Sequence, residues 1–100
     1  MILELAELLI HPGQQAEFEA AIERGLRTVH ARAHGRHGWQ LHKCVETPER
    51  YVLQVMWDSI EAHMVTYRES PLSLEFRPIV APFLAQPPAF QHFDLVATGP

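Results

Sequence analysis

Apolar positions open the chain as a nearly continuous run over residues 2–10, interrupted by Glu4 and Glu7. Pro12 and Gly13 follow the run as a turn signal. The run is too short for a convincing helix, so it predicts a strand buried on most of both faces. Neighbouring elements must then cover both sides of this strand.

Residues 14–33 change to helical spacing, with apolar side chains recurring at steps of three and four. The stripe consists of Phe18, Ala21, Ile22, Gly25, Leu26, Val29 and Ala33. Acidic residues fill the early turns and basic residues the late ones, which complements the helix dipole. Gly35 is placed as a C-terminal cap, and Gly25 within the stripe would permit a close approach to the sheet.

Two alternating runs follow at residues 38–46 and 51–57, joined by a short polar turn. Trp39 falls on one face of the first run and His42 on the other, while the second run ends at Trp57. Alternating runs separated by such a turn predict a β-hairpin.

Beyond the hairpin, Asp58 is placed to cap a helix. Its inward stripe is predicted to be Ile60, His63, Met64 and Tyr67. Ser70 and Pro71 are typical of a second helix start, and that helix is expected to end near Arg77. A last strand is predicted over residues 89–97.

The order β-α-β-β-α-β predicts an α+β protein of the ferredoxin-like class, with a four-stranded antiparallel sheet and helices on one face. Apolar residues on both sides of the strands leave the other sheet face in need of cover. A homodimer that packs sheet against sheet is the simplest solution.

Composition narrows the picture. With 100 residues the chain forms one domain, residues 1–100, and 47% apolar residues place it among globular proteins. A formal charge of −4 without a dense basic run argues against nucleic-acid binding and against anionic membranes. No apolar stretch approaches the roughly 20 residues of a membrane span. The single Cys44 cannot form an internal disulfide, which favours a cytoplasmic location.

One stretch carries a family resemblance. Trp57-Asp58-Ser59-Ile60-Glu61-Ala62-His63, followed by Ser70-Pro71 and Phe76, resembles the signature of the antibiotic biosynthesis monooxygenase (ABM) family. The opening from Ala6-Glu7 to Pro12-Gly13, and Pro87-Pro88 before His92-Phe93, are similar to it as well. The resemblance covers essentially the whole chain and agrees with the predicted element order.

The resemblance implies a dimeric α+β barrel with a pocket between sheet and helices in each subunit. Some members of the family oxidise quinols or aromatic phenols with O₂ and without metal, flavin or haem, while others cleave haem or process small signalling molecules. The haem-cleaving branch resembles this fold but needs an Asn, a Trp and a His in its pocket. In this chain the corresponding positions hold Ala6, Thr66 and Arg77. Haem cleavage is therefore disfavoured.

His63 and Tyr67 lie four residues apart and so share a helix face that should look inward. A polar tip in an apolar pocket could bind a phenol, and a histidine there could act as a general base. Alternatively both are satisfied core residues. Trp57 either lines the pocket, as the resemblance implies, or belongs to the core of the hairpin.

The other candidates are less specific. His42 is either a pocket residue or an interface residue. Arg77 could neutralise a phenolate or carboxylate, or it is a solvated cation at a helix end. His92 is expected at an interface or on the surface.

No metal site is predicted. His30 and His34 lie one turn apart, as in zinc-binding pairs, and His37 is near, but Arg32 and Arg36 surround them with positive charge. Cys44 is interpreted as a small apolar filler rather than a nucleophile. No phosphate-binding loop is present, so no cofactor is expected.

The sequence thus favours a cofactor-independent monooxygenase for a small aromatic or quinol-type molecule. His63 and Tyr67 are the catalytic candidates, and Trp57, His42 and Arg77 the substrate-binding ones. A non-catalytic small-molecule-binding or dimerisation module on the same scaffold is the alternative.

Overall fold

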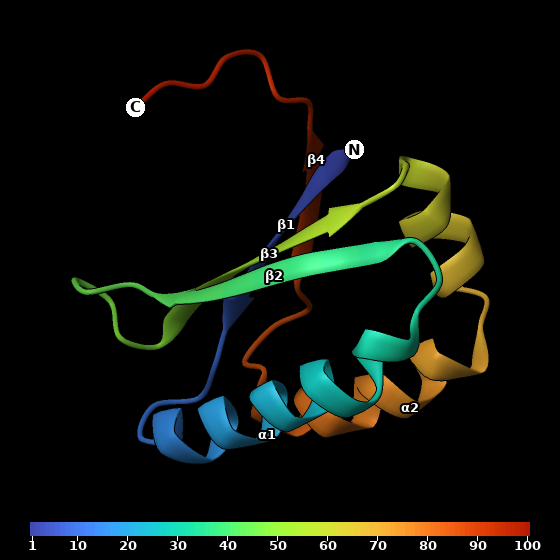
Figure 1. Ribbon diagram of the computed structural model, residues 1–100. Helices are drawn as coiled ribbons and strands as arrows, with labels where there is room; N and C mark the ends of the chain where they lie inside the picture. The colour runs from blue at the N-terminus through green and yellow to red at the C-terminus, as the bar shows by residue number, and fades with distance from the viewer.

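Four strands form one antiparallel sheet in the order β2-β3-β1-β4 (Figure 1). The computed structural model describes residues 1–100. The strands are β1 (Ile2–Leu9), β2 (Arg36–Lys43), β3 (Arg50–Trp57) and β4 (Ala89–Phe93). This order, with helices between β1 and β2 and between β3 and β4, confirms the predicted ferredoxin-like class.

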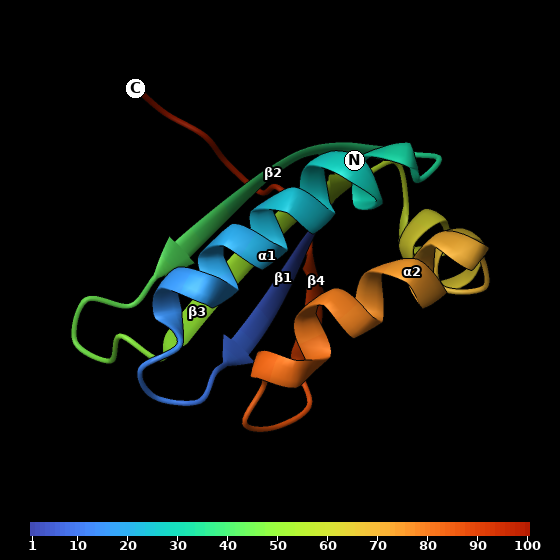
Figure 2. The same cartoon turned by 90° about the horizontal axis from the view of Figure 1, so that it is seen from below.

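Two helices, α1 (Gln15–Thr28) and α2 (Pro71–Val80), lie on one face of the sheet, side by side (Figure 2). Phe18, Ile22 and Leu26 of α1 are fully buried against the sheet, as the stripe predicts. Gly25 differs from expectation, because it faces α2 rather than the sheet. A Cβ atom there would lie 3.1 Å from the Phe76 ring.

The first helix is shorter than the predicted 14–33. It ends at Thr28, and a 3₁₀ turn, η1 (His30–Arg32), leads toward β2. Gly35 then reverses the chain with a φ of +82°, and a Cβ at this position would lie 3.0 Å from the Cβ of Ala62. The strands of the hairpin are confirmed, although β2 spans Arg36–Lys43 instead of 38–46.

The segment after β3 folds as a π-helical turn, η2 (Ala62–Tyr67). Its wider turn keeps His63 and Tyr67 on the inward face but leaves Ile60, predicted in the same stripe, 49% exposed. The cap also differs from prediction, since the backbone N–H of Ala62 donates to Ser59 Oγ rather than to Asp58.

The later elements are displaced from their predicted ends as well. α2 begins at Pro71 as expected but runs past Arg77 to Val80, and a short 3₁₀ turn, η3 (Ala81–Phe83), follows it. β4 ends at Phe93 instead of residue 97. Phe93 pairs with Leu3, so a longer β4 would run beyond the start of its partner strand.

The two faces of the sheet differ in cover. On β1, Ala6 and Leu8 point to the helices and are buried, whereas Leu3 and Leu5 point the other way and are half-buried. β1 is therefore not buried on both faces within one chain. Residues 94–100 leave the sheet on the side opposite the helices (Figure 1).

Candidate functional site

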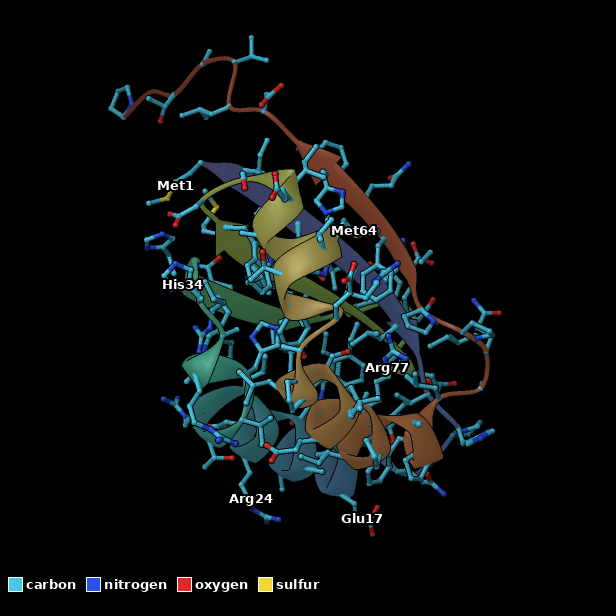
Figure 3. The ribbon with its side chains drawn as sticks, turned by 90° about the vertical axis from the view of Figure 1, so that its right-hand side faces the viewer. Met1, Glu17, Arg24, His34, Met64 and Arg77 are labelled. Carbon is cyan, nitrogen blue, oxygen red and sulfur yellow. The ribbon has the colours of Figure 1, made fainter.

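A cavity of about 490 Å³ lies between the sheet and the helices, in the size range of small-molecule sites. Figure 3 views the molecule from the right-hand side of Figure 1, with Arg77 labelled on α2. The walls are mainly apolar. The lining residues are Glu4, Ala6, Leu8, Ile22, His30, Leu53, His63, Tyr67, Arg68, Ser73, Phe76, Arg77, Val80, Ala81, Leu84, Pro87, Pro88 and Phe90.

A buried carboxyl group stands in the wall formed by β1. Glu4 is 3% exposed, and its Oε1 accepts a hydrogen bond of 2.8 Å from Trp57 Nε1. The same oxygen lies 3.4 Å from His63 Nε2. No Lys or Arg forms an ion pair with Glu4, which is unusual because burying a carboxylate without a cation is costly.

His63 extends this contact to the last strand. Its Nδ1 lies 2.8 Å from Nε2 of His92. The strand register explains the meeting, because Glu4 of β1 pairs directly with His92 of β4 and both side chains face η2. Glu4, His63 and His92 therefore form a chain of hydrogen-bonding groups, called here the Glu4–His63–His92 chain.

Burial determines the protonation of Glu4 and His63 in the Glu4–His63–His92 chain. It raises the pKa of Glu4 to about 7, although the Trp57 hydrogen bond and the charge of Arg68 act in the opposite direction. Burial, with the neighbouring His92 and Arg68, lowers the pKa of His63 to about 4. Near neutral pH His63 is therefore neutral and Glu4 titrates, so the two do not form an ion pair.

Aromatic rings surround the inner end of the cavity. The His63 ring stacks on Trp57, with centroids 4.9 Å apart, and His30 lies within 5.5 Å of the rings of Trp57, Tyr67 and Phe76. Burial raises the pKa of Tyr67, and the nearby Glu4 adds to that rise. Tyr67 is thus a neutral hydroxyl that can donate a hydrogen bond.

His30 is a buried polar residue without compensation. Its Nδ1 is the one buried side-chain nitrogen or oxygen with no hydrogen-bond partner. Burial, together with the charge of Arg36 and the nearby His63, lowers its pKa to about 3. A neutral imidazole with an unpaired nitrogen at a cavity wall is a feature more typical of sites than of cores.

The structure brings three of the predicted residues together and separates two. His63, Tyr67 and Arg77 line the same cavity. Trp57 is fully buried in the core behind it and reaches the site through its contacts with lining residues, among them Glu4 and His63. His42 is exposed and pairs with Val52 on the sheet face that the helices do not cover.

Sequence reasoning missed Glu4, His92 and His30 as members of this site. Glu4 was visible only as a polar interruption of an apolar strand, and its alternation with Ala6 and Leu8 on the inward face was the available signal. His92 was expected at an interface or the surface, because its pairing with β1 is a contact between distant parts of the chain.

The three histidines that follow α1, at positions 30, 34 and 37, do not form a cluster. His30 is buried, His34 is exposed, and His37 contacts Asp58. No group of three or more His, Cys, Asp or Glu side chains has an arrangement that could hold a metal ion. None of the helices has the length and apolar character needed to cross a lipid bilayer.

Comparison with known proteins adds a family. The sequence profile named "Antibiotic biosynthesis monooxygenase" matches residues 1–79. A Bordetella bronchiseptica protein assigned to the antibiotic biosynthesis monooxygenases is 40% identical, with a TM-score of 0.91 over 96% of this chain and 97% of its own.

Two Streptomyces proteins share the fold at lower identity. The monooxygenase from the gene ActVA-Orf6 of Streptomyces coelicolor, solved with the ligand nanaomycin D, is 19% identical, with a TM-score of 0.82 over 99% of this chain and 91% of its own. A variant of SnoaB, a cofactor-independent oxygenase from Streptomyces nogalater, is also 19% identical, with a TM-score of 0.79 over 99% and 96%. At this identity the likeness concerns the fold alone.

Proposed function

The chain belongs to the antibiotic biosynthesis monooxygenase family, and from this premise we propose that it oxygenates a small aromatic or quinol-type substrate without a cofactor. The observation that carries the proposal is the Glu4–His63–His92 chain, of which Glu4 and His63 stand in the wall of a mainly apolar cavity of about 490 Å³. The mainly apolar wall suits a flat aromatic ring, and the polar groups within it can meet a hydroxyl group.

The chemistry begins with a proton. Removing the proton of an electron-rich phenol leaves an anion that can pass an electron to O₂. For an anthrone-type substrate the balance is R₂CH₂ + O₂ → R₂C=O + H₂O, so the substrate itself supplies the electrons. In this scheme the Glu4–His63–His92 chain takes up the proton, and the Tyr67 hydroxyl donates a hydrogen bond to the substrate oxygen.

Arg77 completes the proposed site. It lines the cavity and forms no ion pair with a carboxylate, so its charge is available to the substrate anion. The charge of Arg77 also acts on Tyr67, where it lowers the pKa against the effect of burial. A cation facing the cavity stabilises the negative charge that develops when the phenol loses its proton.

Proteins of the same fold support the reaction class. SnoaB is a cofactor-independent oxygenase, and the Streptomyces coelicolor protein is a monooxygenase that holds nanaomycin D. Their low identity does not transfer a substrate. The proposal for this chain rests on its own cavity and on its family membership.

We further propose that the protein is a cytoplasmic homodimer. The helix-free face of the sheet presents half-buried apolar side chains to solvent. These are Leu3, Leu5, Leu9, Val52 and Met56, beside the exposed Phe93. A second copy packed on this face would remove the apolar surface from water. The lone Cys44 agrees with a reducing compartment.

The competing function is a binding module that holds an aromatic molecule without oxidising it. An oxygen electrode separates the two when anthrone and 1,4-naphthalenediol are offered to protein dialysed against a chelator. Oxygen uptake above the autoxidation rate, absent with heat-denatured protein, is the expected result. Saturable binding of these compounds without any added oxygen uptake would favour the binding module.

A further inference from the structure

The geometry points to Glu4 as the catalytic base: we propose that its carboxylate accepts and keeps the substrate proton, while His63 and His92 link it to solvent. This inference deepens the proposed function, on which its catalytic part rests. Glu4 itself lies outside the residues that carry the family resemblance.

Position is the first argument. Glu4 lines the cavity itself, so its carboxylate touches the space that a substrate would fill. One oxygen, Oε1, is held by Trp57 Nε1 at 2.8 Å and faces His63 Nε2 at 3.4 Å. The other oxygen, Oε2, forms no hydrogen bond within the protein and is not fully buried, so it has access to the cavity.

The surroundings of Glu4 give the second argument. The titratable and charged groups around it are His63 and Tyr67 of η2, Arg68 directly after η2, His92 of β4, His30 of η1 and Arg77 of α2. None of them forms a close ion pair with an ionised partner at neutral pH. Burial therefore dominates, and it brings the pKa of Glu4 to about 7, where a base is most effective in a neutral cell.

His63 is less suited to keep the proton. The pKa of His63, lowered to about 4, means that an imidazolium there would lose its proton at once near neutral pH. Both of its ring nitrogens are also engaged, Nε2 toward Glu4 and Nδ1 toward His92. His63 is therefore the positioning residue that orients the carboxylate.

The chain also gives the proton a route. With Glu4 ionised, His92 can donate to His63 Nδ1 while His63 Nε2 faces the carboxylate at 3.4 Å with its proton; with Glu4 protonated, the proton can pass in the opposite direction. His92 does not line the cavity and is half-buried, so it connects the buried carboxyl to solvent. Glu4 can thus regain its charge between turnovers.

The test compares two glutamates of β1. Glu4→Gln keeps an oxygen acceptor for Trp57 and removes the buried charge, so the variant is expected to fold. Glu7→Gln is the matched control, since Glu7 lies three positions along, on the opposite face, paired with Arg50 at 3.0 Å. With a substrate found by oxygen uptake, kcat/KM of the wild type should rise with pH through about 7.

Glu4→Gln should lower kcat/KM by about 10²-fold or more and abolish this rise, while Glu7→Gln retains both. Glu4→Asp keeps a carboxylate in an altered position, so the rise of kcat/KM with pH should persist in this variant but occur at a different pH. An unchanged limb in Glu4→Gln overturns the proposal. If Glu4→Gln fails to fold, an unshifted limb in Glu4→Asp overturns it instead.

A binding measurement is independent of turnover. Calorimetry with 1-naphthol under anaerobic conditions at pH 7, in buffers of different ionisation enthalpy, counts the protons taken up on binding. When the ligand displaces water from Glu4, the pKa of Glu4 should rise. The wild type and Glu7→Gln should then each take up as much as about half a proton on binding, whereas Glu4→Gln should take up none. Equal proton uptake in all three proteins overturns the role of Glu4. If proton uptake follows the expected pattern but no oxygen uptake is found, the proposed oxygenase is rejected and Glu4 remains the titrating group that contacts the ligand.

Discussion

On β1, Glu4 and Glu7 point to opposite faces of the sheet and meet opposite surroundings. Glu4 is enclosed by helices, has no cationic partner, and its pKa is raised to about 7 by burial. Glu7 faces the other side, where the Arg50 hydrogen bond and charge lower its pKa. Two glutamates of one strand thus differ in charge behaviour: Glu4 titrates near neutral pH, whereas Glu7 stays ionised.

The difference extends across the whole sheet. The helix-covered face holds the cavity, the stacked rings of Trp57 and His63, and the unpaired nitrogen of His30. The open face holds half-buried aliphatic side chains such as Leu5 and Val52 and no comparable cluster of buried polar groups. Strand alternation therefore separates the proposed chemistry from the proposed subunit contact.

The largest effect is expected on the covered face. His63→Ala should reduce turnover by about 10²-fold or more, because it removes the group that orients Glu4 and connects it to His92. Tyr67→Phe should be milder, since it removes one hydrogen-bond donor to the substrate. Steady-state oxygen uptake measures both. His34→Ala, at an exposed histidine, is the control.

Wild-type turnover in both variants, with unchanged thermal melting, would remove His63 and Tyr67 from the site. The covered face would then differ from the open one in packing only, and the comparison would lose its chemical meaning.

A smaller loss should follow from Trp57→Phe. The change deletes the indole N–H that donates to Glu4 and leaves a small void at a fully buried position. Together these should lower the free energy of unfolding by about 2 kcal/mol. Since the Trp57 hydrogen bond lowers the pKa of Glu4, the alkaline-rising limb of activity should also move to higher pH. Urea unfolding and a pH–rate profile measure the two effects, and an unmoved limb would contradict the link.

On the open face, Leu5→Lys should weaken the homodimer at least tenfold, about 1.4 kcal/mol, because it places a charge in an apolar contact. Leu74→Lys is the control, since Leu74 is 69% exposed on α2. Sedimentation velocity over a dilution series measures the association. A wild-type protein that stays monomeric at micromolar concentration would contradict the dimer itself.

The smallest effect concerns His30. His30→Phe keeps the ring contacts and removes the unpaired Nδ1, so the folded state should gain about 1 kcal/mol at neutral pH. The pKa of His30 is about 3 in the folded chain and near 6.5 in the unfolded chain. The unfolded state therefore binds the proton first, and stability present above pH 6.5 is lost as the pH falls toward 3.

His30→Phe should remove the one-proton contribution of His30 to the pH dependence of the free energy of unfolding. The slope should fall by roughly 1.4 kcal/mol per pH unit between about pH 6 and pH 4. Unfolding curves at pH 7, 6 and 5 measure the slope. An identical slope in the variant would show that His30 is not the neutral buried histidine described here.

Much of the fold was within reach of the sequence. Apolar spacing located the helices and the hairpin, and the i, i+4 relation of His63 and Tyr67 placed both on the inward face. The π-helical turn was not foreseeable from that spacing, so Ile60 was assigned wrongly to the stripe. The end of β4 was missed because it depends on where β1 starts, not on the residues of β4.

The site was less accessible. Register alone brings His92 beside Glu4, and no local pattern encodes which residues of two distant strands face each other. Trp57 illustrates the converse, since a residue expected to line the pocket contributes through a hydrogen bond from behind the wall. The start of α2 was predictable from Ser70 and Pro71, but the helix continues past Arg77 to Val80.

An anaerobic crystal structure with bound 1-naphthol tests the division between the two faces most directly. The account predicts the ring in the cavity between sheet and helices, with its hydroxyl within hydrogen-bond distance of the Glu4 carboxylate or of Tyr67. It also predicts that the open face, with Leu5 and Val52, is covered by a second subunit. A ring bound on the open face, or a hydroxyl turned away from Glu4 and Tyr67 inside the cavity, would contradict the account.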